Sequence, residues 1–329
     1  MSALRLSAGL GILLAMAMLA GLWLGDARLG PATLGPALAG EDSLPALILR
    51  ELRLPRVLLG ALVGAGLGAS GAVLQGFFRN PLADPGIVGV SASAGLGAVL
   101  SLYFGAAGAF ALALPLAGVT GAALGVALLF LIAGRGASAT TLILAGVAVN
   151  ALAGALTALI MNLAPNPWAL AEIAYWLMGS LNDASWTELG FAAPLIALGL
   201  ALFLPLRGGL DALSLGEDTA RSLGIGLTRL RVMVVVGTAL AVGGGVAIAG
   251  AIGFVGLVVP HLLRPLTGFR PGALILPSAL GGALLVVLAD LAIRLVSGPG
   301  VPLYLGVVTA LIGAPFFLWL VHASQGRAP

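Results

Sequence analysis

Apolar runs of about twenty residues recur along this whole chain and constrain its fold more than any other feature. As helices, such runs match the roughly 30 Å hydrocarbon core of a bilayer. Only 8% of the 329 residues are charged, against about 25% in soluble domains. A water-soluble fold could not hide so much apolar surface, so we expect the chain to lie in a membrane.

The runs predict helices rather than a barrel. Backbone groups in lipid must be hydrogen-bonded internally, which leaves α-helices or a closed β-barrel. Barrel strands alternate apolar and polar side chains, and these runs do not. The predicted fold class is therefore an all-α integral membrane protein.

Proline, glycine and charge clusters divide the chain into ten predicted spans. They are residues 6–24, 57–77, 89–105, 112–133, 140–163, 189–206, 230–250, 252–267, 273–295 and 303–322.

Two of these spans need comment. The first could be a signal peptide, but it is longer than a typical apolar signal region and further spans follow, which favours an uncleaved helix. The seventh and eighth nearly fuse through "VGGGVAIAGAIGF", where we expect a glycine-rich break or a short half-helix. No soluble domain separates from the rest, so residues 1–329 form a single transmembrane domain.

The arginine distribution predicts the orientation. Ten spans place both termini on one side, and cytoplasmic loops carry an excess of Lys and Arg. With the termini inside, ten arginines are cytoplasmic: Arg5, Arg79, Arg135, Arg207, Arg221, Arg229, Arg231, Arg264, Arg270 and Arg327. Five are then outside: Arg28, Arg50, Arg53, Arg56 and Arg294. The predicted orientation therefore has both termini in the cytoplasm.

Two outer loops are long, covering residues 25–56 and 164–188. The second contains three Trp and one Tyr, which are typical of interfacial segments. Its stretch "AEIAYWLMGSL" could form a short helix across the outer mouth.

The sequence argues against a metal site, a nucleic-acid surface, a dinucleotide site and an ATP site on this chain. The chain has no cysteine, and its only histidines, His261 and His322, lack companion ligands, so we expect no metal site. The arginines stand singly, without a basic face carrying aromatics, which argues against nucleic acid despite a pI near 10.2. "GLGASG" matches a dinucleotide fingerprint but sits inside a span, so we interpret it as helix packing. Without lysine the chain can hold no Walker A loop, so any ATP is hydrolysed by another subunit.

Asp290 is an acid near the outer end of a span, four residues before Arg294. Intramembrane acids are candidates for function, although an i,i+4 pair with Arg294 explains this one simply. Other ionisable groups within the spans are nearly absent, which argues against an ATP-independent carrier and a proton pump. A membrane enzyme is disfavoured because the sequence shows no nucleophile–base pair and no metal cluster.

An ordered series of motifs resembles the FecCD-type permease of type II ABC importers, which import iron–siderophore complexes, haem or cobalamin. The motifs are "RLPRVLLGALVGAGLGASGAVLQGFFRNPLADPGIVGVSASAG", "LILAGVAV", "YWLMGSL", "LGEDTARSLGI", "IGFVGLVVPHLLR" and "LGVVTALIGAPFFLWL", between residues 53 and 320. The resemblance implies the type II permease fold in a bacterial inner membrane. It implies a homodimer or paired permeases, two cytoplasmic ATPase subunits using ATP and Mg²⁺, and a periplasmic binding protein. No cofactor is expected on this chain.

The resemblance also implies three groups of site residues. The cytoplasmic loop at about 208–229 would couple to the ATPase through Leu215, Gly216, Glu217, Ala220, Arg221, Leu223 and Gly224. Outer arginines would dock the binding protein, namely Arg53, Arg56 and Arg294, although the first two could instead anchor to anionic lipid. Residues at the "NPLA" turn and before the fifth span would constrict the cytoplasmic end of the pathway, namely Asn80, Leu82, Ala139 and Thr140.

The sequence departs from the family's pattern in one segment. Where the family usually has "ELPVG" before the last span, this chain has "PLYLG" at 302–306. Because that segment is predicted near the outer mouth, substrate entry or binding-protein docking could differ. The substrate predicted first is an iron chelate, siderophore or haem, with cobalamin as the alternative and a small oxyanion third.

Overall fold

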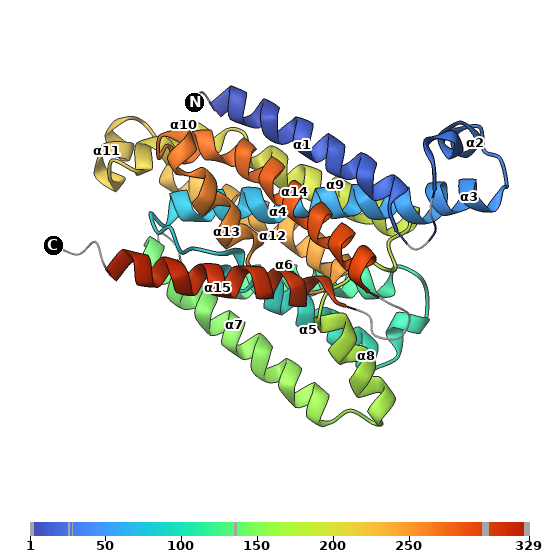
Figure 1. Ribbon diagram of the computed structural model, residues 1–329. Coiled ribbons are helices and arrows are strands. Elements are labelled where there is room, and N and C mark those ends of the chain that lie inside the picture. Colours follow the sequence, from blue (N-terminus) through green and yellow to red (C-terminus); the bar gives the residue numbers. More distant parts are fainter. Residues whose placement is uncertain (1–2, 26, 28, 135–136, 298–302, 326–329) are drawn as a thin grey trace.

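The computed structural model describes residues 3–25, 27, 29–134, 137–297 and 303–325. Arg28, Arg135 and Arg327, used above for orientation, and Pro302 of "PLYLG" lie outside these residues. All regular elements in the described part are helical. The chain therefore has the predicted all-α architecture (Figure 1).

The longer helices are α1 (Ala3–Trp23), α4 (Leu54–Phe77), α5 (Val90–Tyr103), α6 (Ala113–Ala133), α7 (Ala139–Asn162), α8 (Pro167–Leu177), α9 (Trp186–Phe203), α12 (Leu227–Ala249), α14 (Pro271–Val296) and α15 (Leu305–Gln325). The shorter ones are α2 (Leu34–Leu38), α3 (Leu44–Leu47), α10 (Leu206–Leu213), α11 (Glu217–Ser222) and α13 (Val255–Leu263). A π-helical segment, η2 (Ile48–Arg53), leads into α4. Short 3₁₀ turns are η1 (Pro31–Thr33), η3 (Pro85–Val88), η4 (Ala106–Gly108) and η5 (Pro265–Thr267).

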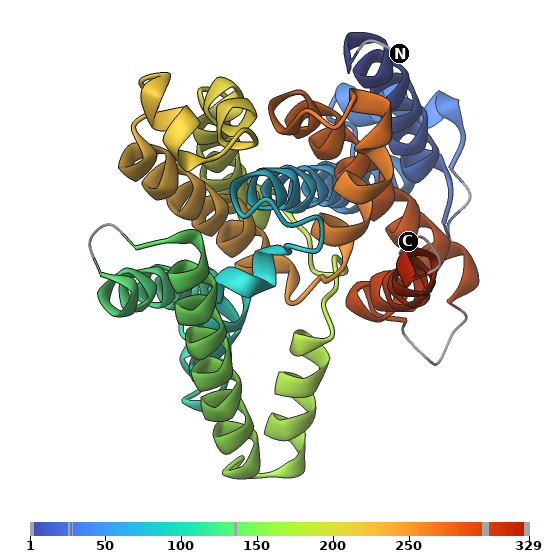
Figure 2. The same ribbon diagram turned by 90° about the vertical axis from the view of Figure 1, so that its left-hand side faces the viewer.

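Helix α4 forms the centre of the bundle. It is buried along most of its length and packs most extensively against α14, then against α12, α13 and α9. Viewed end-on, it lies among these helices, while α7 and α8 project away from them as the two legs of a V (Figure 2). Large apolar side chains on α6 and α7 are exposed, as expected for helices that face lipid or another subunit.

Small residues let α4 approach its neighbours at backbone distance. A Cβ added at Gly68 would overlap the carbonyl oxygen of Ser278 in α14, and one at Gly71 would overlap the carbonyl oxygen of Gly256 in α13. Both glycines belong to "GLGASG", so the interpretation of that motif as helix packing is confirmed.

The glycine-rich break between the seventh and eighth spans is also confirmed. Helix α12 ends at Ala249, Gly250 adopts φ +67°, and Phe254 adopts φ +65° just before α13 begins. The predicted span at 252–267 is only partly helical, because α13 has nine residues and is followed by η5. Two left-handed residues, Gly250 and Phe254, bracket the break, and the half-helix α13 follows it.

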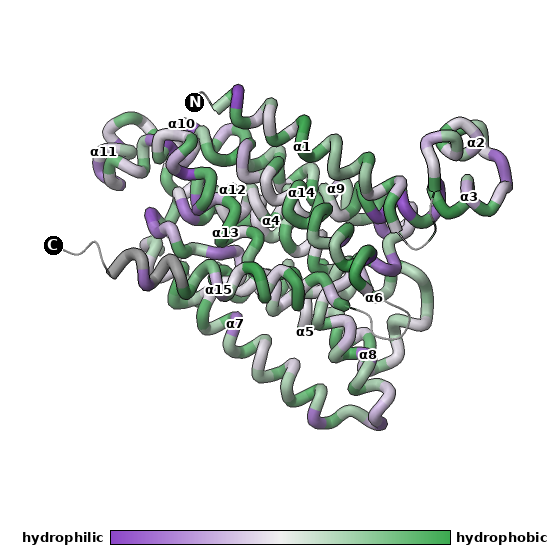
Figure 3. Tube along the Cα trace, in the orientation of Figure 1, coloured by the Kyte–Doolittle hydropathy of each residue, from purple (hydrophilic) through white to green (hydrophobic). Residues whose placement is uncertain are grey.

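Seven helices in the described part are long and apolar enough to cross a membrane, and α5 and α15 supply shorter apolar helices. Nine of the ten predicted spans thus correspond to apolar helices, with the half-helix α13 as the tenth. The start of α1, the end of α15 and the segment α10–α11 all lie at one end of the bundle, and α2 and α3 lie at the other (Figure 1). Hydrophilic residues gather around α10–α11, while apolar residues dominate the middle of the helices (Figure 3).

Candidate functional site

The predicted coupling segment forms two short helices joined by a tight turn. Gly216 adopts φ +111° between α10 and α11, and Gly224 adopts φ +81° after α11, conformations that favour glycine. Ala220 is fully buried and fixes α11 against the bundle. The sequence therefore needs Gly at both turns and a small residue at the contact.

The outward side of this segment is amphipathic. Leu215 and Leu223 are 68% and 61% exposed, although both are apolar. Between them, Arg221 pairs with Glu217 at 3.4 Å and with Asp218 at 3.2 Å, all on the surface. Two exposed leucines flanking a charged helix form a surface that another polypeptide could bury.

Sequence reasoning missed the residue that braces this segment. One carboxylate oxygen of Asp211 in α10 accepts the backbone N–H of Gly272 at 2.8 Å, and the other meets Arg270 at 2.8 Å. Arg207 donates to the carbonyl of Gly272 at 3.2 Å. These bonds tie α10 to the first turn of α14, so a displacement of α10 would act directly on α14.

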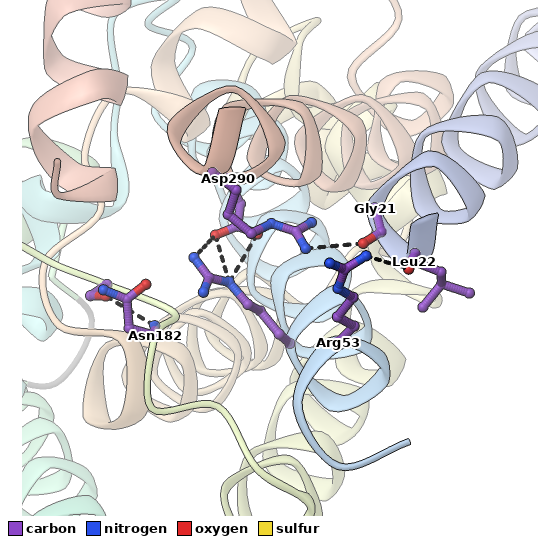
Figure 4. Close-up of polar contacts among 8 residues, drawn as sticks. Gly21, Leu22, Arg53, Asn182 and Asp290 are labelled. Carbon is purple, nitrogen blue, oxygen red and sulfur yellow. Dashed lines mark hydrogen bonds and ion pairs between the residues drawn. The ribbon is translucent and has the colours of Figure 1, made fainter. Parts of the chain in front are cut away.

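The three outer arginines converge on one small region (Figure 4). Asp290 is 4% exposed and accepts two hydrogen bonds from Arg56 through its Oδ1, at 2.7 and 3.0 Å. Arg294 approaches the same carboxylate at 3.2 Å, which confirms the predicted i,i+4 pair. The partnership with Arg56, 234 positions away, could not be seen in the sequence.

Arg53 has a different environment from the one predicted for a docking residue. It is 6% exposed and donates to the carbonyl oxygens of Leu22 and Ala27. Arg294 likewise donates to the carbonyl oxygen of Gly21 at 3.0 Å. The last carbonyls of a helix lack intrahelical partners, so Arg53 and Arg294 cap the outer end of α1. A buried Arg53 does not fit a lipid-facing anchor.

The predicted gate residues lie in two turns at the cytoplasmic end. The Asn80 side chain accepts the backbone N–H of Leu82 at 2.9 Å and so shapes the "NPLA" turn, which leaves Leu82 exposed. Ala139 is the first residue of α7 and Thr140 the second, and the Ser138 hydroxyl caps this helix by accepting the N–H of Thr141 at 3.1 Å. The segment η3, which follows the NPLA turn, packs against α7.

Gln75 is a further polar residue that the sequence analysis did not single out. It is 1% exposed, accepts from Arg264 at 2.7 Å, and its amide lies 3.3 Å from the carbonyl of Leu257. It therefore joins α4 to the half-helix α13. A lone amide in an apolar span was the available signal, because a buried amide must find partners.

Together these features describe a multi-pass membrane protein, with an exposed amphipathic segment at one end and a cationic cluster at the other. The FecCD transport family matches residues 13–323, and the chain belongs to that family. It is accordingly a permease of the ABC importer class, located in the bacterial inner membrane.

The chain is similar in sequence to named permeases over most of their length. The chain is 41% identical to the vitamin B12 import system permease protein BtuC of Vibrio cholerae over 281 residues, 85% of this chain and 84% of that protein. It is 38% identical to the Fe(3+)-citrate import system permease protein YfmD of Bacillus subtilis over 288 residues, 87% of this chain and 84% of that protein. A solved metal-chelate type ABC transporter in an inward-facing conformation superimposes with a TM-score of 0.86 at 35% identity, covering 97% of this chain and 99% of that one.

Proposed function

We propose that this chain is the transmembrane subunit of a type II ABC importer, which moves a metal chelate from a periplasmic binding protein to the cytoplasm. The observation that carries the proposal is the α10–α11 segment, with its exposed Leu215 and Leu223, on a bundle matched to the FecCD family over residues 13–323. The permease itself catalyses no reaction.

The energy would come from two separate ATPase subunits. The sequence contains no lysine and hence no Walker A loop, so ATP and Mg²⁺ belong to the partner. Closure of the ATPases would push α10–α11, and the Asp211 bonds to Arg270 and Gly272 would pass the movement to α14. Such rigid-element shifts can switch access between the two faces.

The outer arginine cluster would receive the binding protein. Arg53, Arg56 and Arg294 outnumber the single buried acid Asp290, so the cluster retains positive charge toward an acidic partner. Arg56 and Arg294 keep 16% and 11% of their side chains exposed, which makes them better contacts than Arg53. Docking through these charges should weaken as salt is raised.

A second copy of the chain would complete the pathway as a homodimer. Helix α7 presents a row of exposed apolar side chains, including Leu144, Val147 and Leu152, which another permease could cover. The path between the copies would be closed at its cytoplasmic end by Asn80, Leu82, Ala139 and Thr140.

For the cargo, the sequence favours an iron chelate, siderophore or haem, with cobalamin as the alternative. Relatives that import vitamin B12 and relatives that import Fe(3+)-citrate are similarly close to this chain, so overall identity does not separate the two classes.

The test is uptake into vesicles that contain the permease, its cognate ATPase and its binding protein. We expect ATP-dependent chelate uptake, abolished by deletion of residues 214–226. A matched control deletes the exposed outer segment 38–42, which lies far from the ATPase side and should leave uptake intact. ATP-driven uptake that survives the 214–226 deletion would refute the coupling role.

A further inference from the structure

An aromatic-walled recess lies beside the arginine cluster on the outer face. Its volume is about 560 Å³, and its walls include the rings of Trp168, Tyr175, Trp176 and Tyr304. A smaller recess of about 220 Å³ shares Glu172, Trp176 and Asp183 with it and extends to Glu188. The larger recess alone has the size of a small-molecule pocket.

The wall that carries two of these rings is fixed by backbone bonds. Tyr304 stacks on Tyr175 of α8 with ring centroids 5.7 Å apart and an angle of 7° between the planes. The next residues join α8 to α15, because the N–H of Leu305 donates to the carbonyl of Gly179 at 2.8 Å and that of Gly306 donates to Met178 at 3.1 Å. Tyr304 is one of the residues, with Pro302, at which this chain departs from the family's "ELPVG" pattern, so the stacked pair uses a ring that the pattern lacks.

The charges on the recess are all negative. Glu172 and Asp183 line both recesses, Glu188 lines the smaller one, and no arginine or histidine is among the lining residues of either. Glu188 accepts from the Ser185 hydroxyl, whereas Glu172 and Asp183 are exposed to the recess mouth. Burial is the main cause that raises the pKa of the Tyr304 phenol. The neighbouring Tyr175 and the charge of Asp183 raise it further.

The neighbouring pocket has the opposite charge. It measures about 300 Å³ and is lined by Arg53, Arg56 and Arg294, and Asn182 borders both pockets. An anion arriving at this face is therefore drawn to the arginine cluster and repelled by the recess. Aromatic faces attract cations and flat apolar surfaces, and carboxylates at the same rim add to that attraction.

We propose that this recess is the entry site for the transported chelate, and that it selects neutral or cationic chelates over anionic ones. The inference rests on the proposed importer function and names its substrate class. Among the cargoes named for relatives, vitamin B12 presents neutral amides around its ring and fits, whereas Fe(3+)-citrate carries surplus carboxylates and does not. By the same argument haem, with its two propionates, is disfavoured relative to uncharged or cationic siderophores.

The experiment measures chelate binding to the permease with its ATPases in lipid nanodiscs, without binding protein, by equilibrium dialysis. The probes are radiolabelled cyanocobalamin (neutral), a ferric trihydroxamate of net positive charge, and ferric citrate (anionic). We expect saturable binding of the first two and weak binding of ferric citrate. The double variant Glu172→Gln/Asp183→Asn should weaken the cationic chelate about fivefold and strengthen ferric citrate about fivefold, as expected for removing like and unlike charges at close range.

Two further variants complete the design. Tyr304→Ala should weaken binding of both the neutral and the cationic chelate, because it removes half of the stacked wall. Glu41→Gln, an exposed outer acid away from the recess, should change nothing. Ferric citrate binding best, no saturable binding of any probe, or no response to the double variant would overturn the proposal. Vesicle uptake with the cognate partners separates this inference from the proposed function. If the double variant takes up chelates with an unchanged charge preference, only this inference is refuted. If no chelate is taken up at all, the proposed function is refuted.

Discussion

Two charged clusters stand at opposite ends of this bundle and are built in opposite ways. The outer cluster buries Asp290 at 4% exposure and joins it to Arg56, 234 positions away in the chain. The inner cluster pairs Arg221 only with Glu217 and Asp218, within one exposed turn of α11. The first cluster therefore connects α4, α14 and α1, and the second connects a short helix only with itself.

This difference separates charges that stabilise the fold from charges that are available to a partner. Breaking a buried pair leaves an uncompensated charge away from water, which is costly, whereas exposed pairs contribute about 0–1 kcal/mol. The outer cluster is thus required for the fold whatever it binds. The charges of α11 contribute little to the fold and remain available to a partner.

The largest effect is expected at Asp290. The Asp290→Ala variant leaves Arg56 and Arg294 without their shared carboxylate, and we expect the isolated permease to lose about 3–5 kcal/mol of unfolding free energy. The measurement is unfolding in mixed micelles. As control, Asp290→Asn keeps the side-chain shape and should lose less. A loss below about 1 kcal/mol in Asp290→Ala would remove the contrast between the two clusters.

The next effect is expected at Arg53, where the fold and docking hypotheses separate. Arg53→Ala removes the hydrogen bonds to the carbonyls of Leu22 and Ala27, and hydrogen bonds to charged groups contribute about 1.5–3 kcal/mol. We therefore expect a destabilised permease in the absence of any binding protein. If stability were unchanged and only the affinity for the binding protein fell, Arg53 would be a docking residue and not a cap on α1. Arg50→Ala, on the neighbouring exposed turn, is the matched control.

The amino-acid sequence predicted the helices well because apolar length is a local property. Span boundaries at α6, α7 and α14 agree to within about two residues, and the break at Gly250 followed from glycine spacing. It overestimated the helical length of the span at 252–267, because apolar composition does not reveal that the left-handed Phe254 delays the helix start.

The site was predicted as a set of positions and not as a set of contacts. The i,i+4 partner of Asp290 was visible in the sequence, but Arg56 required tertiary packing. The burial of Arg53 was also hidden, because it depends on where α1 ends in space. Asp211 was missed for the same reason, since its partners at 270 and 272 lie on another helix. The roles in coupling, docking and gating remain predictions.

A smaller effect is expected at Asp211, the structural acid of the inner end. Asp211→Ala removes both the acceptor for the Gly272 N–H at the start of α14 and the pair with Arg270, and loss of such a cap costs about 0.5–2 kcal/mol. The same variant should also slow ATP-driven uptake, since α10 would no longer be tied to α14. Arg270→Gln keeps the cap and removes only the exposed partner, so it should be milder in both measurements. Equal loss in the two variants would argue against the cap as the link.

The smallest effect on stability, and the sharpest separation of the two clusters, is expected in α11. The variant Glu217→Gln/Arg221→Gln removes a pair whose guanidinium side chain is 61% exposed, so unfolding free energy should fall by less than about 1 kcal/mol. ATP-dependent uptake should nevertheless fall strongly, because a partner loses its contacts. The two ends then differ in what a substitution changes. At Asp290 it lowers the unfolding free energy strongly, whereas at Glu217 and Arg221 it lowers uptake with little change in unfolding free energy. A double variant that keeps full uptake would move the coupling surface to Leu215 and Leu223, which single substitutions to Ser would test in the same vesicles.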